Sequence, residues 1–70
     1  MTQYELILHW LRENGSITPM EAFSHLGITK LATRIGEMIR NGVKIIKTRE
    51  EGLNRYGVKT HWVKYTLKQA

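Results

Sequence analysis

The stretch TKLATRIGEMIRN, residues 29–41, decides the fold of this chain of 70 residues. It follows the pair Gly27-Ile28, begins at a threonine that can cap a helix and runs into Gly42, where a helix can end. At 3.6 residues per turn, one side of such a helix is apolar and carries Leu31, Ile35, Met38 and Ile39. The opposite side is basic and polar and carries Lys30, Thr33, Arg34, Gly36, Glu37, Arg40 and Asn41. The pattern predicts a helix over residues 30–41 that buries one face and exposes the other.

A capping box lies near the start of the chain. In Thr2-Gln3-Tyr4-Glu5 the threonine can accept a hydrogen bond from the backbone of the glutamate, whose side chain reaches back in return. This spacing predicts a helix over residues 3–14, which ends at the pair Asn14-Gly15. Ser16 and Ile17 are then expected to form a short strand, residues 16–17, that pairs with a later hairpin.

A second capping box, Thr18-Pro19-Met20-Glu21, places a proline at the first helical position, where its missing N–H costs nothing. It predicts a short helix over residues 19–26, ended by Gly27. The side chains that this helix is expected to bury are Phe23 and Leu26, with Met20 or Ala22. Only Ile28 separates this helix from the next one, so the two must cross steeply, as in a helix-turn-helix.

After Gly42 the hydrophobic period changes from 3.6 to 2. Residues 43–49 and 59–67 both have the pattern of a strand, and the second one turns Val63, Tyr65 and Leu67 toward the core. Residues 50–57 contain two glycines and an asparagine, which favours a loop. We therefore expect a β-hairpin over residues 43–67, called the wing below, with its tip at residues 50–57.

The expected order is helix, short strand, helix, helix, strand, wing tip, strand, in a single α+β domain over residues 1–70. This order is that of a winged helix. The runs ITPMEA (17–22) and LATRI (31–35), together with residues 26–28, Gly42, Ile45 and residues 65–67, resemble the small helix-turn-helix (winged-helix) family common in phage and prophage genomes. The resemblance covers residues 5–67 and implies a DNA-binding fold.

Composition excludes several classes of protein. The chain has no cysteine, so disulfides, thiolate zinc sites and thiol catalysis are absent. No apolar run approaches the ~20 residues of a membrane span, and no signal-peptide pattern is present. The pairs His9 and Glu13, and Glu21 and His25, lack a third metal ligand nearby in sequence. We expect a cytoplasmic protein of a bacterial cell or a phage-infected host, without enzymatic activity, metal, cofactor or small-molecule substrate.

The net charge of +5 is distributed unevenly along the chain. Residues 1–28 carry one arginine and three glutamates, a balance of −2. Residues 29–70 carry ten lysines and arginines and three glutamates, a balance of +7. Such a split predicts that one surface faces a polyanion while the first two helices support it, although a basic but inert surface would have the same composition.

The helix over residues 30–41 presents the groups that a DNA major groove can bind. Lys30, Thr33 and Arg34 lie near its N-terminal half, the end that normally enters the groove. Thr29 and the free N–H groups of the helix start are suited to a phosphate, and Arg40 and Asn41 to the DNA backbone. Arg34 is suited to a bidentate contact with guanine or to an intrahelical pair with Glu37. Glu37 could orient Arg34 or Arg40, or accept from a cytosine amino group.

The wing supplies a second set of cations. Candidate phosphate contacts are Lys44, Lys47, Arg49, Arg55, Lys59 and Lys64, of which Arg55 at the tip is suited to a minor groove. The same charges would also protect an exposed strand edge against aggregation. Trp62 and Ile46 have the parity of the outer face of the wing, where they would form either a local clamp or a dimer surface.

The sequence therefore predicts a protein that binds double-stranded DNA, sequence-specifically or as an architectural factor, in transcription regulation or site-specific recombination. The helix over residues 30–41 would enter the major groove, and the tip at residues 50–57 would lie near the minor groove or the backbone. The alternative is an interaction module whose basic face binds an acidic protein partner. A homodimer through the first helix, Trp62 or the tip is left open.

Overall fold

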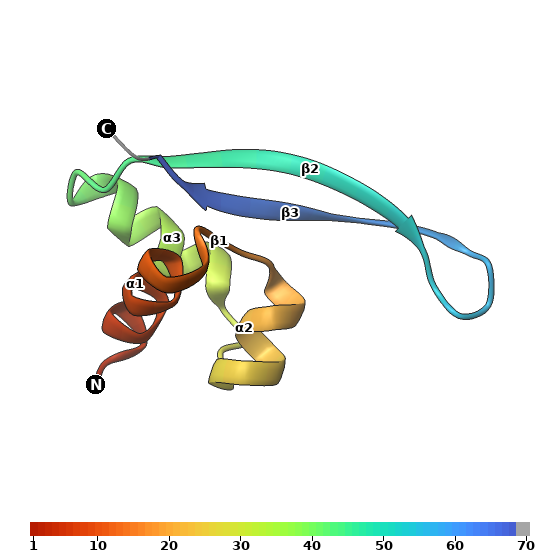
Figure 1. Ribbon diagram of the computed structural model, residues 1–70, viewed down its shortest axis with the longest axis horizontal. Helices are drawn as coiled ribbons and strands as arrows, with labels where there is room; N and C mark the ends of the chain where they lie inside the picture. The colour runs from red at the N-terminus through yellow and green to blue at the C-terminus, as the bar shows by residue number, and fades with distance from the viewer. Residues whose placement is uncertain (69–70) are drawn as a thin grey trace.

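The computed structural model describes residues 1–68 and has the expected winged-helix order of elements. Helix α1 (Gln3–Asn14) is followed by strand β1 (Ser16–Ile17) and helices α2 (Pro19–Leu26) and α3 (Leu31–Arg40). Strands β2 (Ile45–Leu53) and β3 (Lys59–Leu67) form the wing. The helices gather at one end of the molecule, and the wing extends away from them past α2 (Figure 1). The predicted α+β class and element order are confirmed.

Both predicted capping boxes are formed. The hydroxyl of Thr2 accepts from the backbone N–H of Glu5 at 3.1 Å, and the backbone N–H of Thr2 donates to the Glu5 carboxylate at 3.2 Å. Thr18 and Glu21 make the same reciprocal pair at 3.2 and 3.0 Å. Each box satisfies N–H groups that a helix start leaves without partners, which explains why α1 and α2 begin where the sequence predicts.

The start of α3 differs from the prediction. Lys30 occupies the N-cap position without a side-chain hydrogen bond, and Thr29 lies one residue outside it. The helix therefore spans Leu31–Arg40, and Asn41 is its C-cap. The third residue after Thr29 is Ala32, whose methyl group cannot return a hydrogen bond as Glu5 and Glu21 do. At the other end Gly42 adopts a φ of 93°, which confirms it as the residue at which the helical path ends.

The three strands form an antiparallel sheet in the order β1-β3-β2. Strand β1 contacts only the end of β3, where Ser16 pairs with Thr66 and Ile17 with Tyr65. This pairing confirms the predicted short strand. The rest of the wing is a two-stranded ribbon that extends away from the helices and bends at its far end, so that its concave side faces α2 (Figure 1).

Strand β2 begins and ends later than the predicted residues 43–49, whereas β3 has the predicted bounds, and the tip is shorter than predicted. Strand β2 continues to Leu53, so Glu50 and Glu51 are paired with Trp62 and His61 instead of lying in a loop. The tip comprises residues 54–58. It is held by Asn54, whose side-chain oxygen accepts from the backbone N–H groups of Tyr56 at 2.9 Å and Val58 at 3.1 Å. The prediction of a tip at residues 50–57 was wrong because cross-strand pairing, not local composition, determines where the ribbon opens.

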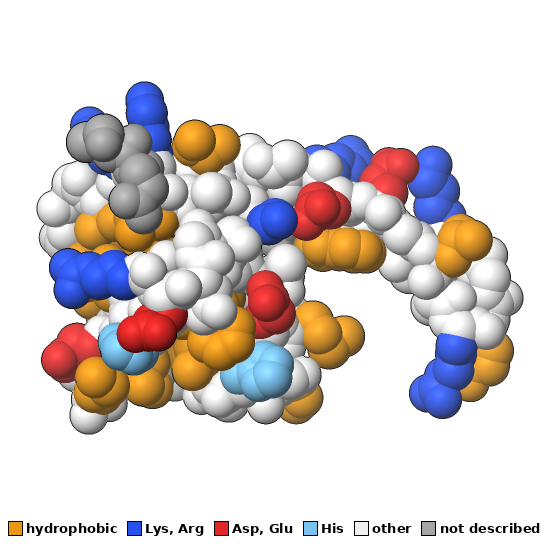
Figure 2. Space-filling view, viewed as in Figure 1, with side chains coloured by type: hydrophobic (Ala, Val, Ile, Leu, Met, Phe, Trp, Pro, Cys, Tyr) orange, Lys and Arg blue, Asp and Glu red, His pale blue; other side chains and the backbone are white. Residues whose placement is uncertain are grey.

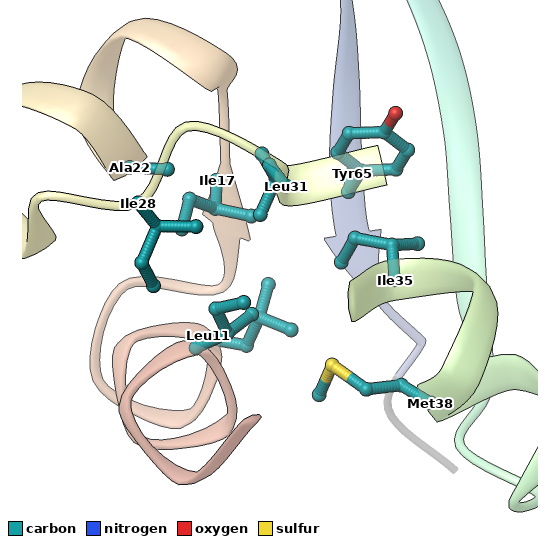
Figure 3. Packing of buried hydrophobic residues seen from close by; sticks show 9 residues of the cluster. Leu11, Ile17, Ala22, Ile28, Leu31, Ile35, Met38 and Tyr65 are labelled. Carbon is teal, nitrogen blue, oxygen red and sulfur yellow. The ribbon is translucent and has the colours of Figure 1, made fainter. Parts of the chain in front are cut away.

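The core lies where α1, β1, α2, α3 and the end of β3 meet. Its fully or almost fully buried side chains are Ile7, Leu11, Ile17, Ala22, Ile28, Leu31, Ile35, Met38 and Tyr65. Figure 3 shows these side chains converging from every one of those elements. Val63 and Leu67 pack against this cluster, as the alternation in β3 predicts.

Two expectations about buried residues are corrected. In α2 only Ala22 is buried and Leu26 is half-buried, whereas Met20 is 72% and Phe23 61% exposed. Phe23 lies about 100° around the helix from Ala22, so the face that packs on α1 and α3 cannot include both. In α3, Ile39 is 39% exposed because it lies at the edge of the buried face. Ile46 and Trp62 do not meet, since their partners are Thr66 and Glu50, and Trp62 lines a groove with Pro19 and Met20 of α2 instead of lying on an outer face.

The two histidine and glutamate pairs of the helices behave differently. The Nε2 atom of His9 lies 3.7 Å from Oε1 of Glu13 on the exposed surface of α1. His25 instead stacks on Trp10, with ring centroids 5.1 Å apart, and the indole N–H of Trp10 donates to the Ser16 carbonyl at 3.0 Å. Residues 1–68 contain no group of three or more potential metal-binding side chains. In the same residues no helix has the length and apolar character to cross a membrane.

Candidate nucleic-acid interface

Helix α3 presents its polar face to solvent because its apolar face is locked into the core. Leu31, Ile35 and Met38 are buried and fix the rotation of the helix. Thr33 and Arg40 lie about 180° from them and are exposed. Lys30 and Thr29 are also exposed at the N-terminal end, and Asn41 at the C-terminal end. The structure thus brings five of the predicted contact residues to the accessible side and the two ends of one helix.

Between Thr33 and Arg40 the exposed face of α3 is low and flat. Gly36 lies on the line that joins these two side chains, and a Cβ built on it would meet nothing within 4 Å. Ala32, on the same side, is also exposed. A surface with so little side-chain bulk lets another molecule approach the helix backbone closely.

Arg34 and Glu37 lie on the flank of α3 that faces α1. The Nη1 atom of Arg34 donates to Oε1 of Glu37 at 2.5 Å, and its Nε atom donates to Oε1 of Gln3 at 3.2 Å. The side chains of Arg34 and Glu37 are each 33% exposed. Of the interpretations left open by the sequence, the structure contains the intrahelical pair, in which Glu37 orients Arg34 and not Arg40.

Gln3 is a member of this cluster that the sequence did not indicate. It lies 31 positions from Arg34 in the chain, and as the first residue of α1 it has no feature that distinguishes it from any exposed glutamine. Only the packing of α1 against α3 brings the two side chains together. Together with Thr2 and Tyr4, this cluster lines a shallow hollow of about 330 Å³.

The cations of the wing are divided between its two faces. Lys47 pairs with Tyr65 and Arg49 with Val63, so both lie on the face of the sheet that continues the core-facing side. Lys59 shares this face and lies 3.2 Å from Glu51. Lys64 lies on the opposite face with Trp62 and Glu50. Lys44 precedes β2 and is exposed near the end of α3.

The tip of the wing carries one cation beside an aromatic ring. The guanidinium of Arg55 lies 5.4 Å from the centre of the Tyr56 ring, and Tyr56 is 78% exposed. Figure 2 shows basic side chains along the wing and at its tip, far from the body of the molecule. The predicted contact residues of α3 therefore lie close together, whereas those of the wing are spread along its length.

A groove separates the wing from α2 and is visible as a hollow beneath the wing in Figure 2. It encloses about 750 Å³ and is lined by residues that include Pro19, Met20, Glu50 and Trp62. The sequence did not indicate this groove because it depends on the curvature of the ribbon.

Comparison with known proteins identifies the fold family. A family model described as a winged helix-turn-helix domain matches residues 2–69. No curated protein and no solved structure matched the chain. A winged helix-turn-helix domain suggests DNA as the partner, and domains of this kind are typically not enzymes.

Proposed function

We propose that this chain, which belongs to the winged helix-turn-helix domain family, binds duplex DNA through α3 and the wing. In this proposal α3 enters the major groove, and the tip at residues 54–58 lies at the minor groove or the backbone. The complex would serve transcription regulation or site-specific recombination, by sequence-specific or architectural binding.

The distribution of charge in space is the observation that carries the proposal. Ten of the eleven lysines and arginines follow residue 28, and α1 and α2 together contain only Arg12. Cations lie on the polar side of α3 and along the wing, which extends away from the helices, so they can reach phosphates at several positions along a duplex. Helices α1 and α2 pack against α3 in the core and so support this surface.

The proposed roles follow from the position of each residue. Lys30, Thr33 and Arg34 are proposed to contact base edges, and Thr29 and the start of α3 are proposed to contact a phosphate. Arg55 is proposed to enter the minor groove. The proposed backbone contacts are Arg40, Asn41, Lys44, Lys47, Arg49 and Lys59.

The test is a series of binding measurements on a random-sequence duplex at increasing salt concentration. We expect the logarithm of the binding constant to fall linearly with the logarithm of the salt concentration, because each phosphate contact releases a counterion. Replacing Lys47 or Arg49 with alanine should reduce this slope by about one each. Arg12→Ala is the matched control, since it removes the same charge from α1 and should leave the slope unchanged. Absence of binding to any duplex at low salt would contradict the proposal.

A second candidate function is binding of an acidic protein partner by the same basic surface. The observation in its favour is that Arg34 already holds a carboxylate, that of Glu37, in the free protein. The two functions are separated by Lys47→Ala and Arg49→Ala: for a protein partner they would weaken capture of that partner while duplex binding stays at background.

A further inference from the structure

Arg34 is the only cation of α3 whose side chain is bound on two sides by described residues. Gln3 of α1 accepts from its Nε atom, and Glu37 accepts from its Nη1 atom. The three side chains come from two elements, so the guanidinium is held between the start of α1 and the middle of α3. The long side chain therefore has a defined direction before any ligand is present.

The pair with Glu37 changes what Arg34 can offer to DNA. A guanidinium has five N–H donors, and the two neighbours use two of them. Three donors remain, but the positive charge is balanced by a carboxylate at 2.5 Å. Because both side chains are two-thirds buried, water screens this pair less than it screens a fully exposed one.

A phosphate and a guanine would respond differently to such an arginine. A phosphate is attracted mainly by net charge, and repulsion from the carboxylate of Glu37 would offset a large part of its attraction to Arg34. Guanine is neutral and presents two adjacent acceptors, N7 and O6, which need two aligned N–H groups and no net charge. The donors that Gln3 and Glu37 leave free can form such a fork.

We propose that Gln3 and Glu37 are positioning residues. They orient Arg34 and balance its charge, so that it binds phosphates weakly and remains able to donate to a base edge. Arg34 then contributes to discrimination between DNA sequences and little to non-specific affinity. Lys47 and Arg49 contribute to non-specific affinity and little to discrimination. This inference rests on the proposed DNA binding and assigns a role to Glu37, an acidic residue on a surface that is otherwise suited to a polyanion.

The test is a double-mutant cycle measured on a random-sequence duplex over a salt series. The proteins are the wild type, Arg34→Ala, Glu37→Gln and the double variant. Glu37→Gln keeps the shape of the side chain and one acceptor oxygen but removes its charge. Since both residues are partly exposed and outside the core, thermal unfolding is expected to show that all four proteins fold.

We expect Arg34→Ala alone to leave the salt slope unchanged, because the paired arginine contacts no phosphate. Glu37→Gln should steepen the slope by about one and tighten non-specific binding, because Arg34 becomes available to a phosphate. The double variant should return to the wild-type slope. A loss of about one from the slope in Arg34→Ala alone, or no change in Glu37→Gln, would overturn the inference.

A second measurement tests whether Arg34 contributes to the choice of DNA sequence. Selection from a pool of randomised duplexes should enrich a guanine at one position with the wild type, and Arg34→Lys should lose this enrichment while its salt slope stays the same. Lysine keeps the charge but lacks the planar fork. Enrichment that survives Arg34→Lys overturns the inference while DNA binding stands. A wild type that binds no duplex overturns the proposed function and this inference together.

Discussion

The indole of Trp62 lies directly against Gly52 on the neighbouring strand of the wing. A Cβ atom built on Gly52 would lie 3.0 Å from Cη2 of Trp62, which is tighter than nine in ten real contacts of a Cβ atom. The two residues are diagonal neighbours, because Gly52 pairs with Thr60 and Trp62 with Glu50. Strand β1 reaches only Tyr65 and Thr66, so Trp62 covers a part of the wing that has no third strand. This contact favours the local clamp among the two roles open to Trp62.

Gly52→Ala is therefore expected to destabilise the wing by about 1 kcal/mol, because the indole must shift by a few tenths of an ångström to admit the added methyl group. The measurement is the chemical shift of the Trp62 indole N–H, together with urea unfolding. The indole N–H of Trp10, which is bonded to Ser16 in the helical body, serves as the internal control. An unchanged Trp62 resonance would show that the ring does not rest on Gly52 in solution.

Gly36→Ala should have the opposite effect on stability. Gly36 has helical geometry within α3, and its Cβ would meet nothing, so alanine gains helix propensity without a clash. We expect the free energy of unfolding to rise by about 0.5–1 kcal/mol. Duplex affinity should fall at the same time, because the methyl group lies on the flat face between Thr33 and Arg40. Tighter DNA binding by the stabilised variant would argue that this face does not meet DNA.

Thr18→Ala should cost about 1 kcal/mol of stability, because it removes the hydroxyl that caps α2. Thr29→Ala is the matched control: Thr29 lies outside α3 and makes no capping bond, so the same change should leave unfolding almost unaltered. Chemical denaturation of both variants decides the matter. Equal losses would mean that Thr29 caps α3 after all.

The stability of α1 should depend on pH through Glu5. Hydrogen bonds from the Thr2 backbone N–H, and then from its hydroxyl, lower the pKa of Glu5 below its ordinary value. A carboxyl group whose pKa is lower in the folded state contributes its full stabilisation above the ordinary pKa and loses it as the pH falls through the lowered pKa. Glu5→Gln should thus reduce stability near neutral pH and flatten the acid limb of a plot of unfolding free energy against pH. Parallel curves for the two proteins would contradict this linkage.

The sequence predicted the features that depend on neighbours along the chain. The boxes at Thr2 and Thr18 located α1 and α2, and the alternation around Tyr65 assigned the core face of β3. These signals are local because a capping bond or a strand period involves residues two to four positions apart.

The features that the sequence did not predict depend on contacts between distant segments. Glu50 and Glu51 resemble loop residues but belong to β2, because β3 pairs with them. Phe23 is apolar yet exposed, because α2 packs against the other helices through the side that carries Ala22. The bond from Arg34 to Gln3 joins α3 to α1 and could not be read from either segment alone.

The most direct test of the DNA-binding surface is a titration of isotope-labelled protein with a short duplex, followed by the backbone amide resonances. We predict that the largest shifts fall on residues 29–34 and on Lys47, Arg49 and Arg55, while Arg12 and Glu13 in α1 stay unchanged. Shifts that instead gather on α2 and the groove beside Trp62, or no shifts with a large excess of duplex, would contradict binding through α3 and the wing.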